Sequence, residues 1–166
     1  MKKIGEFIRI IVFGICGAIL MFWLQPIVYD REWLIVKNDD SVLQGTSLQQ
    51  WLADDYTISA LIVYVACMGA TVIWYILGTI FANPVSSKDK QIWRVIWMLL
   101  ALLPLISIIY AALFYNRSET AQISLVGFYI MNALLLFWLP TATSSPEAIK
   151  YIPPVGFLLR HEVMGD

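Results

Sequence analysis

Charged and uncharged positions along this chain are separated into long blocks. Four stretches contain no Asp, Glu, Lys or Arg and are dominated by large apolar residues, while all charges lie between or outside them. A soluble helix of similar length would need charged or polar residues along its outer face. The four uncharged stretches are Ile10–Tyr29, Tyr56–Ser87, Val95–Asn116 and Thr120–Pro146.

Each stretch is long enough to cross a lipid bilayer as a helix. A hydrocarbon core about 30 Å thick requires about 20 residues at a rise of about 1.5 Å per residue. Backbone groups in lipid need hydrogen-bond partners within their own segment, which favours helices. With 166 residues, 60% of them hydrophobic and 14% charged, the sequence predicts an all-α integral membrane protein. We expect one four-transmembrane-helix bundle that forms a single membrane domain over residues 1–166.

Prolines give the expected ends of the spans. We expect helices to end before Pro26, at Pro84 and at Pro140, because proline has no N–H with which to continue a helix. Pro104 lies in the middle of the third span, where a kink would serve either irregular packing, which we favour, or a gate. The predicted spans are about residues 8–24, 58–81, 92–115 and 123–139.

The basic residues are distributed unequally between the two sides of this bundle. Because basic residues concentrate in cytoplasmic segments, we expect both termini in the cytoplasm, with an outer loop at 29–57, a cytoplasmic loop at 82–91 and a cytoplasmic tail at 140–166. The lysine-rich start and the short loops favour the plasma (inner) membrane of a bacterium. The majority side holds eight of the 11 basic residues, namely Lys2, Lys3, Arg9, Lys88, Lys90, Arg94, Lys150 and Arg160, and the other side holds Arg31, Lys37 and Arg117.

The outer loop contains a predicted short helix. Ser47, followed three residues later by a glutamine, has the spacing of a capping box, and the helix would carry Leu48, Trp51 and Leu52 on one face. This face either docks on a protein surface or lies on the lipid headgroups, which we favour. Asp54-Asp55 would stabilise the N-terminus of the second span.

The tail contains a second predicted short helix. Ser145-Pro146-Glu147 has the pattern of a helix N-terminus, and Pro153-Pro154 would end the helix. This amphipathic segment and the apolar residues after it should dock either on the inner leaflet or on a partner. The tail-docking residues are Ile149, Ile152, Phe157 and Leu158.

Residues that could carry catalysis or bind a metal are scarce in the spans. The span interiors contain no Asp, Glu, Lys, Arg or His, which argues against a small proton-coupled exporter, because that would need a titratable carboxylate near the midplane. His161, the single histidine, is in the tail, and Cys16 and Cys67 are interpreted as small core residues rather than a redox pair. We therefore expect no catalytic, cofactor or metal site and no nucleic-acid partner.

Small and amide residues in the spans indicate helix packing. Small residues at spacings of three and four allow close approach between helices, either within this bundle, which we favour, or with another subunit. Asn132 is the most polar side chain deep in a span, and we expect it to hydrogen-bond a neighbouring helix rather than a substrate. The small residues are Gly14 and Gly17 in the first span and Ala66, Gly69 and Ala70 in the second.

Three classes of function remain open. We favour a non-catalytic subunit, scaffold or assembly factor of a membrane complex, which would contact the lipid bilayer and either a membrane-protein partner or further copies of itself. A small oligomeric channel or pore is the alternative, although Ser59, Thr71 and Gly78 are scattered rather than aligned as a polar stripe. A membrane-embedded lipid-modifying enzyme is the third, and the sequence contains no evident nucleophile–base pair for it.

Overall fold

The computed structural model describes residues 2–31, 33, 47–81, 89–115, 119–143, 153 and 156. In these parts of the chain every regular element is helical, and four helices are long and apolar enough to cross a membrane. The predicted all-helical architecture with four such helices is therefore confirmed. The elements are α1 (Lys2–Ile19), η1 (Leu20–Leu24), α2 (Gln25–Asp30), α3 (Leu48–Trp51), η2 (Leu52–Tyr56), α4 (Thr57–Phe81), α5 (Asp89–Phe114), α6 (Glu119–Ala133), η3 (Leu134–Trp138) and α7 (Leu139–Thr143).

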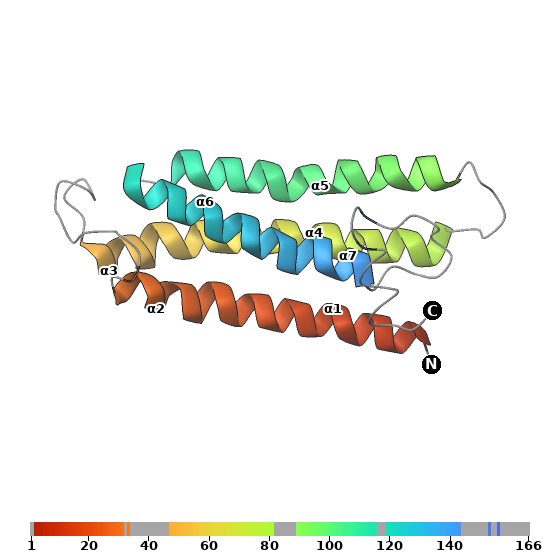
Figure 1. Ribbon diagram of the computed structural model, residues 1–166, viewed down its shortest axis with the longest axis horizontal. Coiled ribbons are helices and arrows are strands. Elements are labelled where there is room, and N and C mark those ends of the chain that lie inside the picture. Colours follow the sequence, from red (N-terminus) through yellow and green to blue (C-terminus); the bar gives the residue numbers. More distant parts are fainter. Residues whose placement is uncertain are drawn as a thin grey trace.

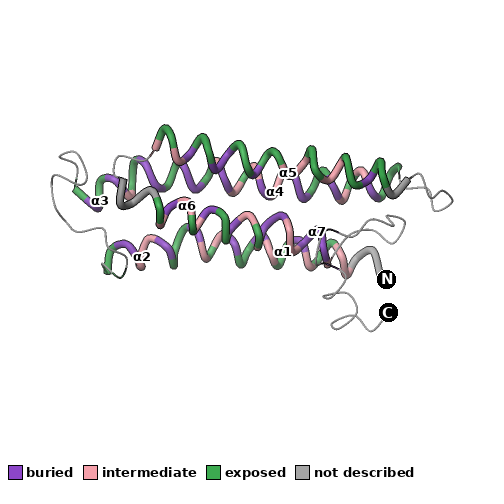
Figure 2. Tube along the Cα trace, turned by 45° about the horizontal axis from the view of Figure 1, so that its top comes forward, coloured by how far each residue is buried: buried purple, intermediate pink, exposed green. Residues whose placement is uncertain are grey.

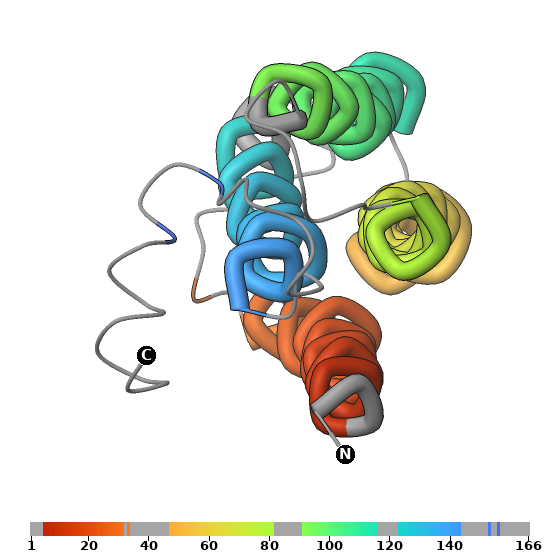
Figure 3. The backbone as a smooth tube through the Cα atoms, turned by 90° about the vertical axis from the view of Figure 1, so that its right-hand side faces the viewer, coloured from red at the N-terminus to blue at the C-terminus, as the bar shows by residue number. Residues whose placement is uncertain are grey.

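These elements form four helical runs. The first run is α1–η1–α2, the second is α3–η2–α4, the third is α5 and the fourth is α6–η3–α7. Figures 1 and 3 show α4 and the fourth run in the middle, with the first run on one side and α5 on the other. We call the end where α2 and α3 lie the Asp30 end and the opposite end, which holds α7, the Thr143 end (Figure 1).

Two prolines that were expected to end helices lie inside them. The first run continues through Pro26 as α2, and the fourth continues through Pro140 as α7. A five-residue π-helical turn precedes each proline closely; in the first, the Gln25 N–H bonds to the Leu20 carbonyl, five residues back. The expectation that proline ends these helices is wrong, because local π turns and neighbouring side chains can accommodate proline in a membrane helix.

The predicted short helix after Ser47 exists, but it is not separate from the second span. The Ser47 Oγ accepts a hydrogen bond from the Gln50 N–H at 3.2 Å, which confirms the expected N-cap. The helix then continues through η2 into α4, so that Asp54-Asp55 lies within it rather than before it. The predicted break is wrong because Trp51 and Tyr56, on either side of it, are both buried in the core.

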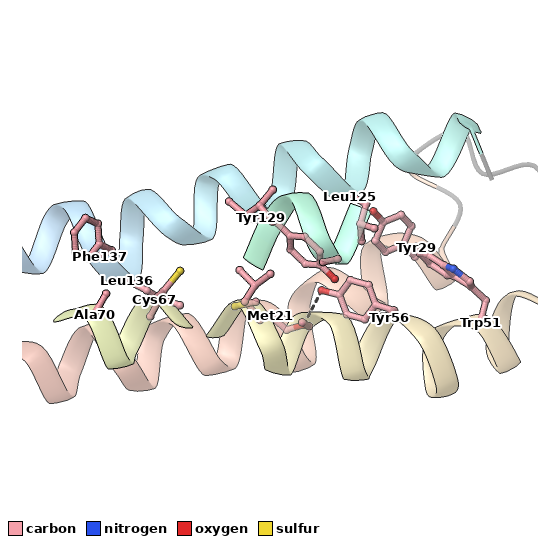
Figure 4. Packing of buried hydrophobic residues seen from close by; sticks show 14 of the residues in the cluster. Met21, Tyr29, Trp51, Tyr56, Cys67, Ala70, Leu125, Tyr129, Leu136 and Phe137 are labelled. Carbon is pink, nitrogen blue, oxygen red and sulfur yellow. Dashed lines mark hydrogen bonds between the residues drawn. The ribbon is translucent and has the colours of Figure 1, made fainter. Parts of the chain in front are cut away.

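The buried faces of the runs meet in a common core. Figure 2 shows buried positions on the inward sides of the helices and exposed positions on the outward sides. The main cluster extends along the bundle from aromatic side chains near the Asp30 end to Leu136 and Phe137 near the Thr143 end (Figure 4). The outward sides of α1, α4 and α5 are apolar, as Ile15, Val65 and Leu99 illustrate, which suits contact with lipid.

The predicted tail lies almost wholly outside the described residues. This holds for the docking residues Ile149, Ile152, Phe157 and Leu158, whose role stays a prediction. Of the tail after the fourth run, Pro153 and Gly156 are described, and both are buried. The Gly156 N–H donates a hydrogen bond to the Pro153 carbonyl at 2.9 Å.

Gly14 and Gly17 are points of close approach between the first run and its neighbours. A Cβ atom at Gly17 would lie 2.2 Å from Leu136 Cδ2 in the fourth run, and one at Gly14 would lie 2.9 Å from Met68 Cε in α4. The Gly14 carbonyl also accepts a hydrogen bond from the Tyr64 hydroxyl at 3.1 Å. Both glycines therefore face helices of the same chain, which favours packing within the bundle over contact with another subunit.

We predict that Gly17→Ala destabilises the protein by about 1–3 kcal/mol, because the new methyl group overlaps the buried Leu136 side chain. Gly127→Ala is the matched control, since nothing lies within 4 Å of a Cβ atom there. Thermal unfolding of both variants in detergent measures the difference. Equal melting temperatures of the two variants would contradict the prediction, because they would show that the first run can move away from Leu136 of the fourth run without loss of stability.

Candidate functional site

Two amide side chains join the first and fourth runs in the protein interior. Gln25 Nε2 donates to Asn132 Oδ1, and Asn132 Nδ2 donates to Gln25 Oε1, both at 3.0 Å. Both side chains are essentially inaccessible to solvent. Because each amide offers donors and acceptors together, this reciprocal pair satisfies one of each on both partners. Asn132 thus has its hydrogen-bonding partner on another helix, and that partner is Gln25.

Hydroxyl groups of the second and fourth runs extend this amide pair. The Tyr56 hydroxyl lies 2.8 Å from Gln25 Oε1 and 2.8 Å from the Met21 carbonyl oxygen. Figure 4 shows the second of these contacts. The Ser59 hydroxyl donates to the Tyr56 carbonyl at 2.9 Å and is also hydrogen-bonded to the Tyr129 hydroxyl. This set of side chains, which we call the amide–phenol cluster, connects the first, second and fourth runs. Its members are Gln25, Tyr56, Ser59, Tyr129 and Asn132.

An aromatic layer separates the amide–phenol cluster from the Asp30 end. Tyr29 packs edge-on against Trp51, Tyr56 and Phe128, with ring centroids 5.3, 5.7 and 5.6 Å apart. The Tyr29 hydroxyl is hydrogen-bonded to Ser124 Oγ at 3.1 Å. Edge-to-face pairs of this kind stabilise a core beyond their buried area. Trp51 is fully buried, and among the described residues its Nε1–H is the one buried side-chain polar group without a hydrogen-bond partner.

Three further polar contacts lie nearer the Thr143 end. Thr71 Oγ1 donates to the Leu136 carbonyl at 2.6 Å, and Trp97 Nε1 donates to Thr141 Oγ1 at 3.0 Å. Arg9 Nη1 donates to the Thr143 carbonyl at 3.0 Å, where a positive charge also interacts favourably with the C-terminus of a helix. These contacts join α4, α5 and the first run to the fourth run.

The polar residues considered for a pore face the core of this single bundle. Ser59, Thr71 and Gly78 are all buried, and the two hydroxyl groups bond to neighbouring residues of the same chain. The three residues therefore lie at three depths in the core and do not line a surface. The hydroxyl groups of Ser59 and Thr71 contribute to contacts between helices.

The small residues of α4 lie at the edge of the core. Ala70 is fully buried, Ala66 is half-buried, and a Cβ atom at Gly69 would have nothing within 4 Å. Gly69 lies between Val65 and Val72 on an exposed apolar stripe of the helix, at spacings of four and three residues. It therefore forms a notch in that stripe and points away from the other three runs.

The amide–phenol cluster is built from groups that hydrogen-bond without carrying charge. The acidic and basic side chains that the structure describes lie toward the ends of the runs, at Glu6, Arg9, Asp30-Arg31, Asp54-Asp55 and Arg94. Within the described ranges no three His, Cys, Asp or Glu side chains come together as a metal-binding group. Cys16, on the exposed side of α1, and Cys67, in the core, are both free thiols. Because its groups are uncharged and bond to one another, the amide–phenol cluster is suited to holding the helices in position.

Asn132 is predictable from the sequence as a buried hydrogen-bonding residue, but its partner Gln25 and the Tyr56 hydroxyl bonded to Gln25 are not among the predicted site residues. Gln25 falls just beyond the predicted first span, which ends at residue 24 because Pro26 follows, and Tyr56 falls in the predicted outer loop at 29–57. The sequence does contain a signal: within an apolar stretch, the fold must provide hydrogen-bond partners for a glutamine amide and also for the backbone carbonyl that a neighbouring proline leaves without an N–H donor.

Comparison of the chain with protein-family models, with curated proteins and with solved structures found no match.

We predict that Asn132→Leu destabilises the protein by about 1–2 kcal/mol, because it leaves the buried Gln25 amide without its partner. The double variant Gln25→Leu/Asn132→Leu should recover most of this loss, since both buried amides are then removed together. Thermal unfolding of the single and double variants measures the coupling. Additive losses would contradict a direct pair, and loss of activity at full stability and unchanged assembly would assign Asn132 to a ligand or a pore.

Proposed function

We propose that this chain is a non-catalytic subunit, scaffold or assembly factor of a membrane complex. The observation that supports this most directly is the use of the buried polar groups. Gln25, Tyr56, Ser59, Tyr129 and Asn132 are hydrogen-bonded to one another or to backbone carbonyls. Groups that already satisfy each other are poorly placed to bind a substrate or to line an aqueous path, whereas they suit contacts between helices.

The outward face of α4 offers a surface for a partner helix. Its exposed stripe contains Leu61, Val65, Val72 and Ile76, and Gly69 interrupts it with a notch that none of the described side chains fills. Lipid provides no hydrophobic drive for helix association, so close packing at small residues has to supply the attraction. A transmembrane helix of another subunit would fit this notch more closely than lipid chains.

The location that we propose is the plasma membrane of a bacterium, with both termini in the cytoplasm. The four apolar helices make the chain a candidate multi-pass membrane protein. The excess of Lys and Arg before the first run, between the second and third runs, and after the fourth supports the cytoplasmic assignment of both termini. On this assignment the Asp30 end, with its aromatic layer, faces outward.

We predict that Gly69→Leu releases a partner while the monomer keeps its melting temperature, because the added side chain fills open space beside α4. Gly127→Leu is the matched control, since it also adds a leucine at an open glycine but on α6. The measurement is co-purification of tagged protein in mild detergent, combined with thermal unfolding. Stoichiometric unrelated proteins, lost selectively from Gly69→Leu, support the proposal.

Two results of that experiment would contradict the proposal. A variant that melts normally and retains every partner would show that the Gly69 notch faces lipid. A pure homo-oligomer, with no other protein present, would favour the channel or pore instead.

We also predict the outcome of reporter fusions that fluoresce only in the cytoplasm. A fusion after Asp166 or within Ser86–Lys90 should be bright, and an insertion near Gln44-Gly45 should be dark, because the basic residues flank the first two positions. Expression levels of the three fusions, measured by immunoblot, provide the control. A bright insertion at Gln44 together with a dark fusion at Asp166 would reverse the topology.

A further inference from the structure

The turn before Pro26 leaves one buried carbonyl without a backbone partner. In a regular α-helix the Gln25 N–H would bond to the Met21 carbonyl, but here it bonds to Leu20. In the π register the donor to Met21 would be residue 26, which is proline and has no N–H. Met21 is fully buried, so water cannot supply the missing hydrogen bond.

The Tyr56 hydroxyl supplies the missing donor. It lies 2.8 Å from the Met21 carbonyl oxygen and 2.8 Å from Gln25 Oε1, but a phenol carries a single proton. Gln25 Oε1 has a second donor in Asn132 Nδ2, at 3.0 Å, whereas the two backbone donors that would serve the Met21 carbonyl are displaced or absent. The Met21 carbonyl therefore depends on Tyr56 more strongly than the amide oxygen does.

Both sides of this contact lie in π-helical turns. Met21 is in η1, and Tyr56 is the last residue of η2. Beyond these turns toward the Asp30 end, α2 and α3 pack against each other through Tyr29 and Trp51, whose ring centroids are 5.3 Å apart. The turn at η1 thus separates the long α1 from a short outer segment, and it is the place where the first run lacks a regular backbone hydrogen bond.

We propose that η1 is a hinge and that the Tyr56 hydroxyl is the latch that keeps it closed. With the latch closed, α2 continues the line of α1 (Figure 1) and Gln25 stays paired with Asn132. Figure 4 shows the Tyr56–Met21 hydrogen bond that forms the latch. With the latch open, the Gln25–Asp30 segment tilts away from the fourth run and the Gln25–Asn132 pair separates. This proposal rests on the hydrogen bonds at η1 and does not depend on the partner surface proposed at Gly69.

The test compares amide hydrogen exchange in three single variants of the full chain. Tyr56→Phe removes only the hydroxyl, and we expect about five- to tenfold faster exchange of the amides in residues 22–30. Tyr64→Phe is the matched control: its hydroxyl also bonds to a carbonyl of the first run, that of Gly14, but within regular α-helix, so exchange should change less than twofold. Equal acceleration in the two variants, or none in Tyr56→Phe, would overturn the proposal.

The third variant, Pro26→Ala, restores the missing backbone N–H. The Met21 carbonyl then gains a donor, either residue 26 in the π register or Gln25 in the α register, so Tyr56→Phe should no longer accelerate exchange in this background. If Tyr56→Phe alone does not fold, the double variant is expected to fold. Acceleration that persists in the double variant, or a double variant that also fails to fold, would refute the latch.

A distance measurement tests the hinge itself. Spin labels at the exposed residues Asp30 and Ile123, in a background with Cys16→Ser and Cys67→Ala, report the separation between α2 and α6. Tyr56→Phe should add a second, longer distance, and Tyr64→Phe should not. A single unchanged distance in Tyr56→Phe would contradict opening at η1.

Discussion

The hydrogen-bonding demand of backbone carbonyls next to proline shapes this bundle. A carbonyl that loses its helical partner inside a bilayer has no water to replace that partner, and leaving it unpaired costs several kcal/mol. The first and fourth runs each contain such a proline after a π-helical turn. In both cases a hydroxyl of the second run bonds to a nearby carbonyl: Tyr56 to Met21 and Thr71 to Leu136. The second run therefore donates hydroxyl hydrogen bonds to backbone carbonyls of both the first and the fourth run.

This arrangement explains why the polar groups are concentrated where they are. Gln25 is beside the first proline, and its amide reaches Asn132 of the fourth run and the same Tyr56 hydroxyl that bonds to Met21. Ser59 and Tyr129 complete the set one turn away. A buried polar network of this kind specifies one arrangement of helices, since any other register would leave several groups unpaired. The apolar outer faces impose no such requirement, and they leave the bundle free to contact lipid or another helix.

The proposed hinge and the proposed surface for a partner helix lie in different parts of the molecule. The hinge lies in the interior, at η1 and the Tyr56 hydroxyl, whereas the Gly69 notch lies on the outward stripe of α4. The aromatic layer of Tyr29, Trp51 and Phe128 belongs to the Asp30 end and packs the short segments beyond the π turns. A change at one site can therefore be studied without altering the contacts of the other.

The sequence by itself predicted an all-helical protein with the four long apolar helices that the described residues contain, because the thickness of a bilayer sets the length of an uncharged stretch. It also identified the Ser47 N-cap and the amide of Asn132, since both depend on local residue chemistry. Only the tertiary structure decided that helices continue past Pro26 and Pro140, and that Asp54-Asp55 lies within a helix. Proline ends an isolated helix because it has no N–H to donate to the preceding turn, but here the Tyr56 hydroxyl, distant in sequence, donates to the Met21 carbonyl that lacks such a partner. No pattern within one segment contains that information, because the donors come from another helix.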